Sequence, residues 1–293
     1  MKPLIPDSPS PRAPSRPEPV ISVIIPVYNR IRMLERALRS VSAQQRPADE
    51  VIVVDDGSND GVAALVRGFP DVQYLKQARQ GVSAARNTGI RAARGNWIAL
   101  LDSDDEWHPD KLLRQCLLIA DQPDCVLVHC DEIWIRNGRR INPGRKHRKR
   151  GGHIFRHCLP LCAISPSAVL IRKSVLDGSG LFDESLPACE DYDLWLRLCS
   201  RHAVEYIDRP LLTKYGGHPD QLSKQHWGMD RFRIEALNNI LQQQHLRPRD
   251  RQAATDMLVK KCRIFINGAV RRGRTEHIEK YRNILAQYTV TTP

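Results

Sequence analysis

The sequence predicts an α/β fold built on a mostly parallel sheet flanked by helices, and two observations lead to this class. Apolar runs bounded by turn residues occur at residues 21–27, 50–54 and 97–101, and continuous runs of this length are typical of strands buried on both faces. Segments with helical spacing separate the runs, which indicates parallel βαβ units. In open α/β sheets a ligand binds beyond the carboxyl ends of the strands, so the polar residues that follow the runs are expected to form one site.

The elements follow one another in a regular order. Seven prolines among the first 19 residues predict a disordered tail at 1–19, because this composition cannot build a core. Ordered structure is expected from Val20 onward. The spacing of apolar residues then predicts helices at 30–45, 61–68 and 81–93, a helix that begins at Pro109, and strands at 72–75 and 125–135.

Composition sets the outer limits of the interpretation. A chain of 293 residues that is 41% hydrophobic can bury a large core. No apolar run approaches the roughly 18 residues needed to cross a bilayer, and the start of the chain lacks the apolar segment of a signal peptide. We therefore expect a cytoplasmic protein, with peripheral contact to the inner face of the cell membrane as a further option. The eight cysteines lack paired CxxC spacing, which favours buried thiols over zinc ligands or disulfides.

Three carboxylates follow the run at 97–101 within four residues. Asp102 and Asp104 are two apart, so on an extended strand their side chains leave the same face and can converge on one ion. Hard oxygen donors suit Mg²⁺ or Mn²⁺, which completes its coordination with substrate phosphates and water. The alternative for an isolated motif of this kind is a solvated acidic turn. The run at 50–54 also ends in carboxylates, Asp55 and Asp56, so polar groups from several strands are expected at one edge.

Several motifs occur in a fixed order along the chain: V-I-I-P-V-Y-N, V-V-D-D-G-S, G-V-S-A-A-R-N-T-G-I, L-L-D-S-D-D-E-W-H-P-D, G-L-F-D-E and C-E-D-Y-D-L-W-L-R. Together they resemble family 2 glycosyltransferases over roughly residues 20–225. The resemblance implies a GT-A type, Rossmann-like mixed and mostly parallel sheet, with a nucleotide-binding half at 20–136 and an acceptor-binding half at 151–225. It also implies inverting transfer of a sugar from a nucleotide diphosphate, with UDP the expected nucleotide, to a hydroxyl of a glycan or lipid-linked acceptor in cell-surface polysaccharide or glycoconjugate biosynthesis.

The same resemblance assigns roles to the acidic residues and one histidine. Asp104 is the expected direct ligand of Mn²⁺ or Mg²⁺, and Asp102 is expected to contact the metal, the ribose or both. Asp191 is the expected general base, with Glu190 orienting the acceptor or the base; capping of a helix N-terminus is the alternative for both. His218 is the third expected metal ligand, or a diphosphate ligand, with a structural role equally open.

The donor nucleotide sugar is expected to contact a larger set. Its members are Pro26, Tyr28, Asn29, Asp55, Asp56, Arg86, Asn87, Asp102 and Ser103. Tyr28 would lie near the base or ribose, and Asp56 or Asp55 would accept a hydrogen bond from the uracil ring. Arg86 and Asn87 would face the diphosphate or the base from a helix, and a surface position is the alternative for the arginine.

Positive charge is concentrated in two parts of the chain, whose formal net charge is +12. Residues 136–150 contain eight Lys or Arg and no acid, which indicates either a solvated loop or attraction of phosphate-bearing partners. Residues 226–293 are expected to form a basic helical extension. Anionic membrane is a possible partner of that extension. Nucleic acid is not expected, because aromatic interleaving, zinc-finger spacing and RNP-like segments are lacking.

Other classes fit the motifs less well. A sugar-phosphate nucleotidyltransferase would open with a glycine-rich basic loop, where this chain has Pro26-Val27-Tyr28-Asn29. A dehalogenase-like phosphatase would carry its paired aspartates after the first strand. The P-loop and dinucleotide fingerprints do not occur. A non-catalytic nucleotide-sugar-binding protein remains as the rival interpretation.

Overall fold

The computed structural model describes residues 18–217, 226–274 and 278–289. One mixed sheet of nine strands runs through the molecule in the order β3-β2-β1-β4-β8-β6-β9-β5, with β7 paired to β6. Its first four strands are parallel: β3 (Val72–Lys76), β2 (Glu50–Asp55), β1 (Ile21–Val27) and β4 (Trp97–Leu100). These strands lie where the apolar runs predicted them, so the expected parallel half of the sheet is confirmed.

The second part of the sheet is mixed. β8 (Leu170–Arg172) is antiparallel to β4 and to β6 (Leu127–Arg136), whereas β9 (Glu205–Gly216) is parallel to β6. The short strand β5 (Glu106–Trp107) closes the edge, and β7 (Arg139–Ile141) forms a hairpin with β6. The segment 136–150, expected as a loop, therefore contains a strand, and it also contains the 3₁₀ turn Arg145–His147.

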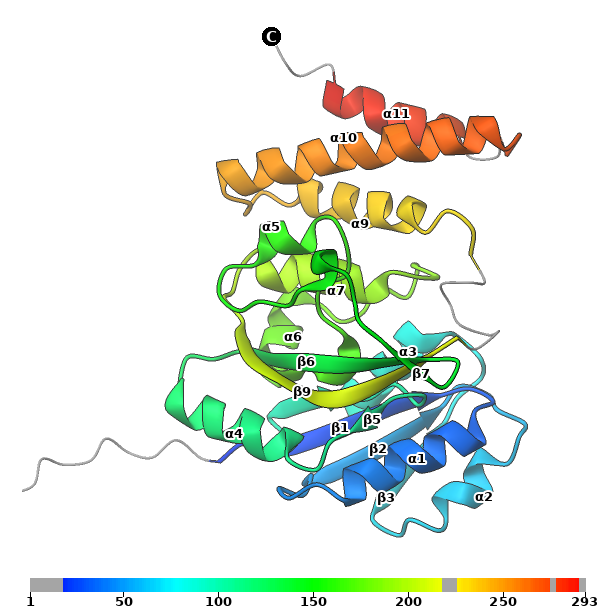
Figure 1. Cartoon of the computed structure of the whole chain (residues 1–293), viewed down its shortest axis with the longest axis vertical. Helices are drawn as coiled ribbons and strands as arrows, with labels where there is room; N and C mark the ends of the chain where they lie inside the picture. Colours follow the sequence, from blue (N-terminus) through cyan, green and yellow to red (C-terminus); the bar gives the residue numbers. More distant parts are fainter. Residues whose placement is uncertain (1–17, 218–225, 275–277, 290–293) are drawn as a thin grey trace, which may run out of the picture.

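Helices cover both faces of the sheet (Figure 1). In chain order they are α1 (Ile31–Ser42), α2 (Val62–Val66), α3 (Val82–Ala92), α4 (Lys111–Asp121), α5 (Phe155–Cys158), α6 (Lys173–Ser179), α7 (Glu190–Cys199), α9 (Asp230–Gln242), α10 (Pro248–Arg271) and α11 (Ile278–Thr289). Among these, none combines the length and the apolar character that crossing a bilayer requires.

Two hydrophobic cores lie on opposite faces of the sheet, because successive side chains of a strand alternate between faces. On β1, Ile21, Val23 and Ile25 pack toward α1 and α4, whereas Ile24 packs toward α3 and α7. Small residues bring α3 close to the sheet, since a Cβ atom at Gly89 would collide with Ile24. This close approach fixes the height at which α3 holds its N-terminal side chains above the carboxyl edge.

The three C-terminal helices form a layer on α7 and confirm the expected helical extension (Figure 1). α9 packs on α7, and α10 packs on α9 and α11. Buried side chains of this layer, including Leu237, Leu258 and Tyr281, belong to the same core as the inner face of α7. The extension therefore shares its hydrophobic core with the sheet domain, so α9 stabilises the helix that begins with Glu190.

Candidate active site

A cleft of about 720 Å³ opens at the carboxyl edge of the parallel strands. The residues that follow β1, β2 and β4 form one wall, the first turn of α3 forms a second, and the start of α7 and the end of β9 close it. The predicted site residues that line it are Pro26, Tyr28, Asn29, Asp56, Arg86, Asp102, Ser103, Asp104, Glu190 and Asp191. Segments far apart in the sequence thus meet where the parallel topology requires.

The remaining predicted residues lie elsewhere. The Asp55 carboxylate accepts hydrogen bonds from the Ser58 amide (2.7 Å) and the Tyr74 hydroxyl (2.5 Å), and Asp55 does not line the cleft. Asn87 forms paired hydrogen bonds with the backbone of Phe182, at 2.8 and 3.0 Å. Both side chains therefore hold the scaffold around the site. His218 lies outside the described residues.

Asp56 forms the end of the cleft below Tyr28. Its carboxylate accepts hydrogen bonds at 2.8 Å from the Gln77 side chain and from the amides of Gln80 and Gly81. The Arg79 guanidinium lies 4.2 Å from the centre of the Tyr28 ring. These contacts join the ends of β1, β2 and β3 into one rigid end wall.

Arg86 joins the two halves of the site. Its guanidinium donates to the Asp102 carboxylate at 2.7 Å and to the Glu190 carboxylate at 2.6 Å, and the arginine is 3% exposed. Burial alone would lower the pKa of Arg86, but the two carboxylates outweigh it and raise the pKa. Burial likewise would raise the pKa of Asp102, yet Arg86 and Lys214 hold it below its ordinary value. Arg86 is thus a buried cation, not a surface arginine.

The acidic turn after β4 is held by residues from three other segments. Arg30 donates to the Asp104 carboxylate at 2.6 Å. The Ser167 hydroxyl accepts from the Asp102 amide at 3.0 Å and donates to the Asp105 carboxylate at 2.6 Å. Burial raises the pKa of Asp105 well above its ordinary value, and the nearby charges of Asp104 and Asp102 add to the effect. Asp105 is therefore a supporting group of the turn, which leaves Asp104 and Asp102 facing the cleft.

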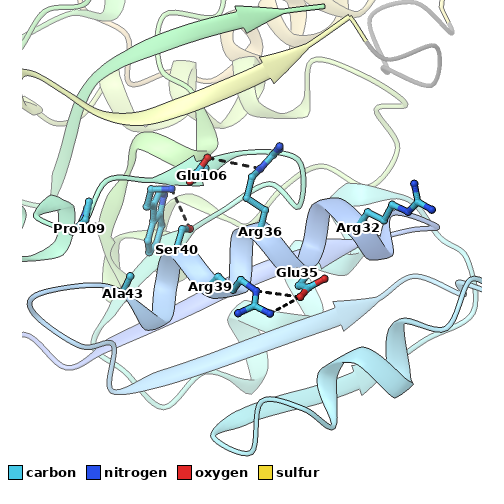
Figure 2. Close-up of a pocket in the computed structure, with 9 residues that line it drawn as sticks. Arg32, Glu35, Arg36, Arg39, Ser40, Ala43, Glu106 and Pro109 are labelled. Atoms are coloured by element: carbon cyan, nitrogen blue, oxygen red, sulfur yellow. Dashed lines mark hydrogen bonds and ion pairs between the residues drawn. The ribbon is translucent and has the colours of Figure 1, made fainter. Parts of the chain in front are cut away.

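A shallower depression of about 420 Å³ lies on the α1 side of the same turn. Figure 2 shows Arg36 of α1 reaching toward Glu106 there. The Arg36 guanidinium also donates to the Asp104 backbone oxygen at 2.5 Å and lies 3.6 Å from the centre of the Tyr215 ring. Arg36 thus connects α1, the acidic turn and β9, and it helps to fix the backbone at Asp104.

Glu190 and Asp191 begin α7, where the helix dipole favours negative charge. The preceding residue, Cys189, has φ of 63°, a left-handed conformation that costs energy for a residue with a side chain. Burial raises the pKa of Glu190, opposed by Arg86. The Asp191 carboxylate accepts a hydrogen bond from the Cys162 thiol at 3.0 Å. No side-chain cap is formed at this helix start, so both acids point to functions other than capping.

Lys214 and Cys162 are site residues that sequence reasoning missed. The Lys214 ammonium donates to the Ser165 hydroxyl at 3.2 Å and lies among carboxylates of four segments. Burial would lower the pKa of Lys214, but the surrounding negative charges outweigh it and raise the pKa. Those charges belong to Glu132, Asp105, Asp102 and Asp191. A lysine within the apolar strand Leu211-Leu212-Thr213-Lys214 was the one available signal.

Two carboxylates of the cleft meet part of what a divalent ion requires. Asp104 and Asp102 stand at one edge of the cleft, and Mg²⁺ is commonly held by one or two carboxylates together with substrate phosphates. Within the described ranges, no cluster of three or more His, Cys, Asp or Glu side chains is arranged to hold a metal by itself. The residues present therefore fit an ion whose remaining ligands come from a phosphate-bearing substrate.

Comparisons with known proteins agree on one family. The model of glycosyl transferase family 2 matches residues 22–179. An uncharacterized glycosyltransferase of Rickettsia conorii is 31% identical over 194 residues, which covers 65% of this chain and 32% of that protein. The chain thus corresponds to about a third of that relative's length.

Two solved structures share the fold. Staphylococcus aureus TarS in complex with UDP-GlcNAc superposes with a TM-score of 0.72 at 20% identity, covering 93% of this chain and 81% of that chain. The mannosyltransferase PcManGT of Pyrobaculum calidifontis, in complex with GDP-Man and Mn²⁺, superposes with a TM-score of 0.55 at 19% identity, covering 96% of this chain and 87% of that chain. The expected GT-A type fold is confirmed.

Proposed function

Because the chain belongs to the family 2 glycosyltransferases, we propose that it transfers a sugar from a nucleotide-diphosphate donor to a hydroxyl group of an acceptor. One observation carries the proposal: a single open cleft holds the acidic turn with Asp104 and, across it, Asp191 at the start of a helix. Such a cleft can hold a diphosphate at one wall and an acceptor hydroxyl at the other. TarS and PcManGT bind UDP-GlcNAc and GDP-Man, which supports a nucleotide sugar as donor, and we propose UDP as its nucleotide.

Donor binding is assigned to the β1–β4 side of the cleft. Tyr28, flanked by Arg79, offers a flat surface for the base, and Asp56 offers carboxylate oxygens beside it. Asp104 and Asp102 would hold Mn²⁺ or Mg²⁺. When bound, that ion neutralises charge on the departing diphosphate, which contributes several kcal/mol to catalysis. Arg86 keeps Asp102 ionised and in place for this task.

The acceptor side is assigned to α7. The acceptor oxygen attacks the anomeric carbon while the bond from that carbon to the diphosphate oxygen breaks, and the acceptor proton passes to the Asp191 carboxylate. Attack from the side opposite the leaving group inverts the anomeric centre. The Cys162 thiol binds one Asp191 oxygen and so orients the carboxylate. Glu190, fixed by Arg86, is placed to orient the acceptor.

A screen of nucleotide sugars for Mn²⁺-dependent hydrolysis tests this function, with water replacing the acceptor. Asp104→Ala and Asp191→Asn should each lower the rate by about 10²-fold or more. Asp71→Asn, at an exposed carboxylate outside the cleft, serves as the control and should retain the rate. Hydrolysis that is insensitive to both site variants would disprove the assignment. Nucleotide binding that survives Asp191→Asn, with no turnover by either form, would identify a non-catalytic binding protein.

A further inference from the structure

The segment 136–150 forms a basic surface that the proposed reaction does not yet use. Its exposed cations are Arg136, Arg139, Arg140, Arg145, Lys146, Arg148 and Arg150, called here the basic rim. No acidic residue lies within the segment. None of the rim side chains forms an ion pair with a carboxylate in the part of the chain that the structure describes. Seven positive charges therefore face solvent together.

The rim is held in a fixed position by buried contacts. The remaining cation of the segment, Lys149, turns inward and lies 3.2 Å from the Glu132 carboxylate, with the two side chains 5% and 2% exposed. The His129 ring donates to the Arg150 backbone oxygen at 2.8 Å, and burial lowers the pKa of His129 to about 3, so the ring is neutral. The His147 ring lies 5.1 Å from the Trp134 ring. A solvated loop would not need these anchors.

Strand register places the rim beside the cleft. β6 pairs with β9 so that Trp134 faces Lys214 and Arg136 faces Gly216, and the hairpin pairs Arg136 with Arg139. Side chains two apart on a strand share a face, so Arg136 and Arg139 project on the face of Lys214, which lines the cleft. Two residues along a strand span about 6–7 Å. The first rim charges thus lie about one side-chain length from the cleft mouth.

We propose that the basic rim binds an acceptor that carries several phosphate groups near the hydroxyl it offers. This inference rests on the proposed function and names its substrate class. The donor diphosphate already has partners at the acidic turn, on the other wall of the cleft, and seven further cations exceed what one diphosphate needs. Arginine predominates in the rim, and its planar fork binds phosphate oxygens in pairs. A chain of phosphates that runs from the cleft along the hairpin matches this arrangement.

Binding of inorganic polyphosphate to the full chain tests the proposal, because this probe has the phosphate spacing of a polyanion without a lipid. The rim variant R136Q/R139Q/R140Q should bind it about tenfold more weakly than wild type at about 0.1 M salt, where charges act over about 10 Å. The control R249Q/R263Q/R271Q removes three exposed arginines of α10 and changes the net charge equally. It should bind polyphosphate within about twofold of wild type.

UDP binding and vesicle binding distinguish a phosphate-bearing acceptor from a donor-site role, an effect of net charge and a membrane surface. UDP affinity should be unchanged in the rim variant, and a loss there would place the rim in the donor site and overturn the proposal. Equal weakening by the rim and control variants would also overturn it, since net charge would then account for binding. Loss of binding to phosphatidylglycerol vesicles with polyphosphate binding intact would identify a membrane surface instead. Failure of the proposed function is seen separately, as absence of nucleotide-sugar hydrolysis by wild type.

Discussion

Replacement of Arg86 by methionine should destabilise the protein far more than its single charge suggests. The guanidinium is 3% exposed and binds two carboxylates at 2.6 and 2.7 Å, so its removal leaves Asp102 and Glu190 without their buried partner. Breaking a buried ion pair from one side costs about 3–5 kcal/mol. At about 2 °C or more per kcal/mol in a domain of this size, the melting temperature should fall by about 6 °C or more.

Urea unfolding followed by tryptophan fluorescence measures this loss. The matched control is Arg91→Met on the same helix, whose partner Glu184 is 3.4 Å away and whose side chain is 61% exposed; its cost should stay below about 1 kcal/mol. Adding Glu190→Gln to the Arg86→Met variant should recover part of the stability, because one stranded charge is removed. A loss below about 1 kcal/mol in Arg86→Met would refute the view that Arg86 holds the two halves of the site together.

Two further predictions concern packing and pH. Gly89→Ala should cost about 1–3 kcal/mol, because the new Cβ would collide with β1, whereas Gly178→Ala meets no atom within 4 Å and should be neutral or stabilising in thermal unfolding. For Glu132, burial alone would raise the pKa, but Lys149 and Lys214 lower it from 4.5 to about 2. The stability it contributes is therefore present above pH 4.5 and lost as the pH falls toward 2, by up to about 3 kcal/mol. Urea titrations across this range should show a flatter pH dependence for Glu132→Gln, and an unchanged slope would contradict the depressed pKa.

Sequence patterns predicted the parallel half of the sheet and most of the residues that line the cleft. Both follow from local rules, because continuous apolar runs produce buried strands and parallel strands bring their carboxyl ends together. The mixed half was predicted less well. β5 and β7 have only two and three residues, which is too short for a periodic signal, and their pairing is set by the long strands β6 and β9.

Asp55 and Asp56 show why sequence reasoning could not choose between neighbours. Adjacent side chains at the end of a strand point to opposite faces, so only one of the two can face the cleft. The sequence offers identical carboxyl groups at both positions. The choice is made by Tyr74 and Ser58, which bind Asp55, and β3 brings Tyr74 there only in the folded sheet.

The site also accounts for how the chain tolerates three carboxylates within four residues. Each acid at the turn has a compensating group from a distant segment: Arg30 for Asp104, Arg86 for Asp102, and Ser167 for Asp105. Asp104 is thus paired before any ligand arrives. An ion that takes Asp104 as a ligand has to compete with Arg30, so ion affinity in the absence of nucleotide should be weak. Added diphosphate supplies the negative oxygens that favour the exchange, and this couples ion binding to donor binding. Titration of Mn²⁺ by electron paramagnetic resonance should therefore show much tighter binding with UDP than without it, and equal affinities would contradict the coupling.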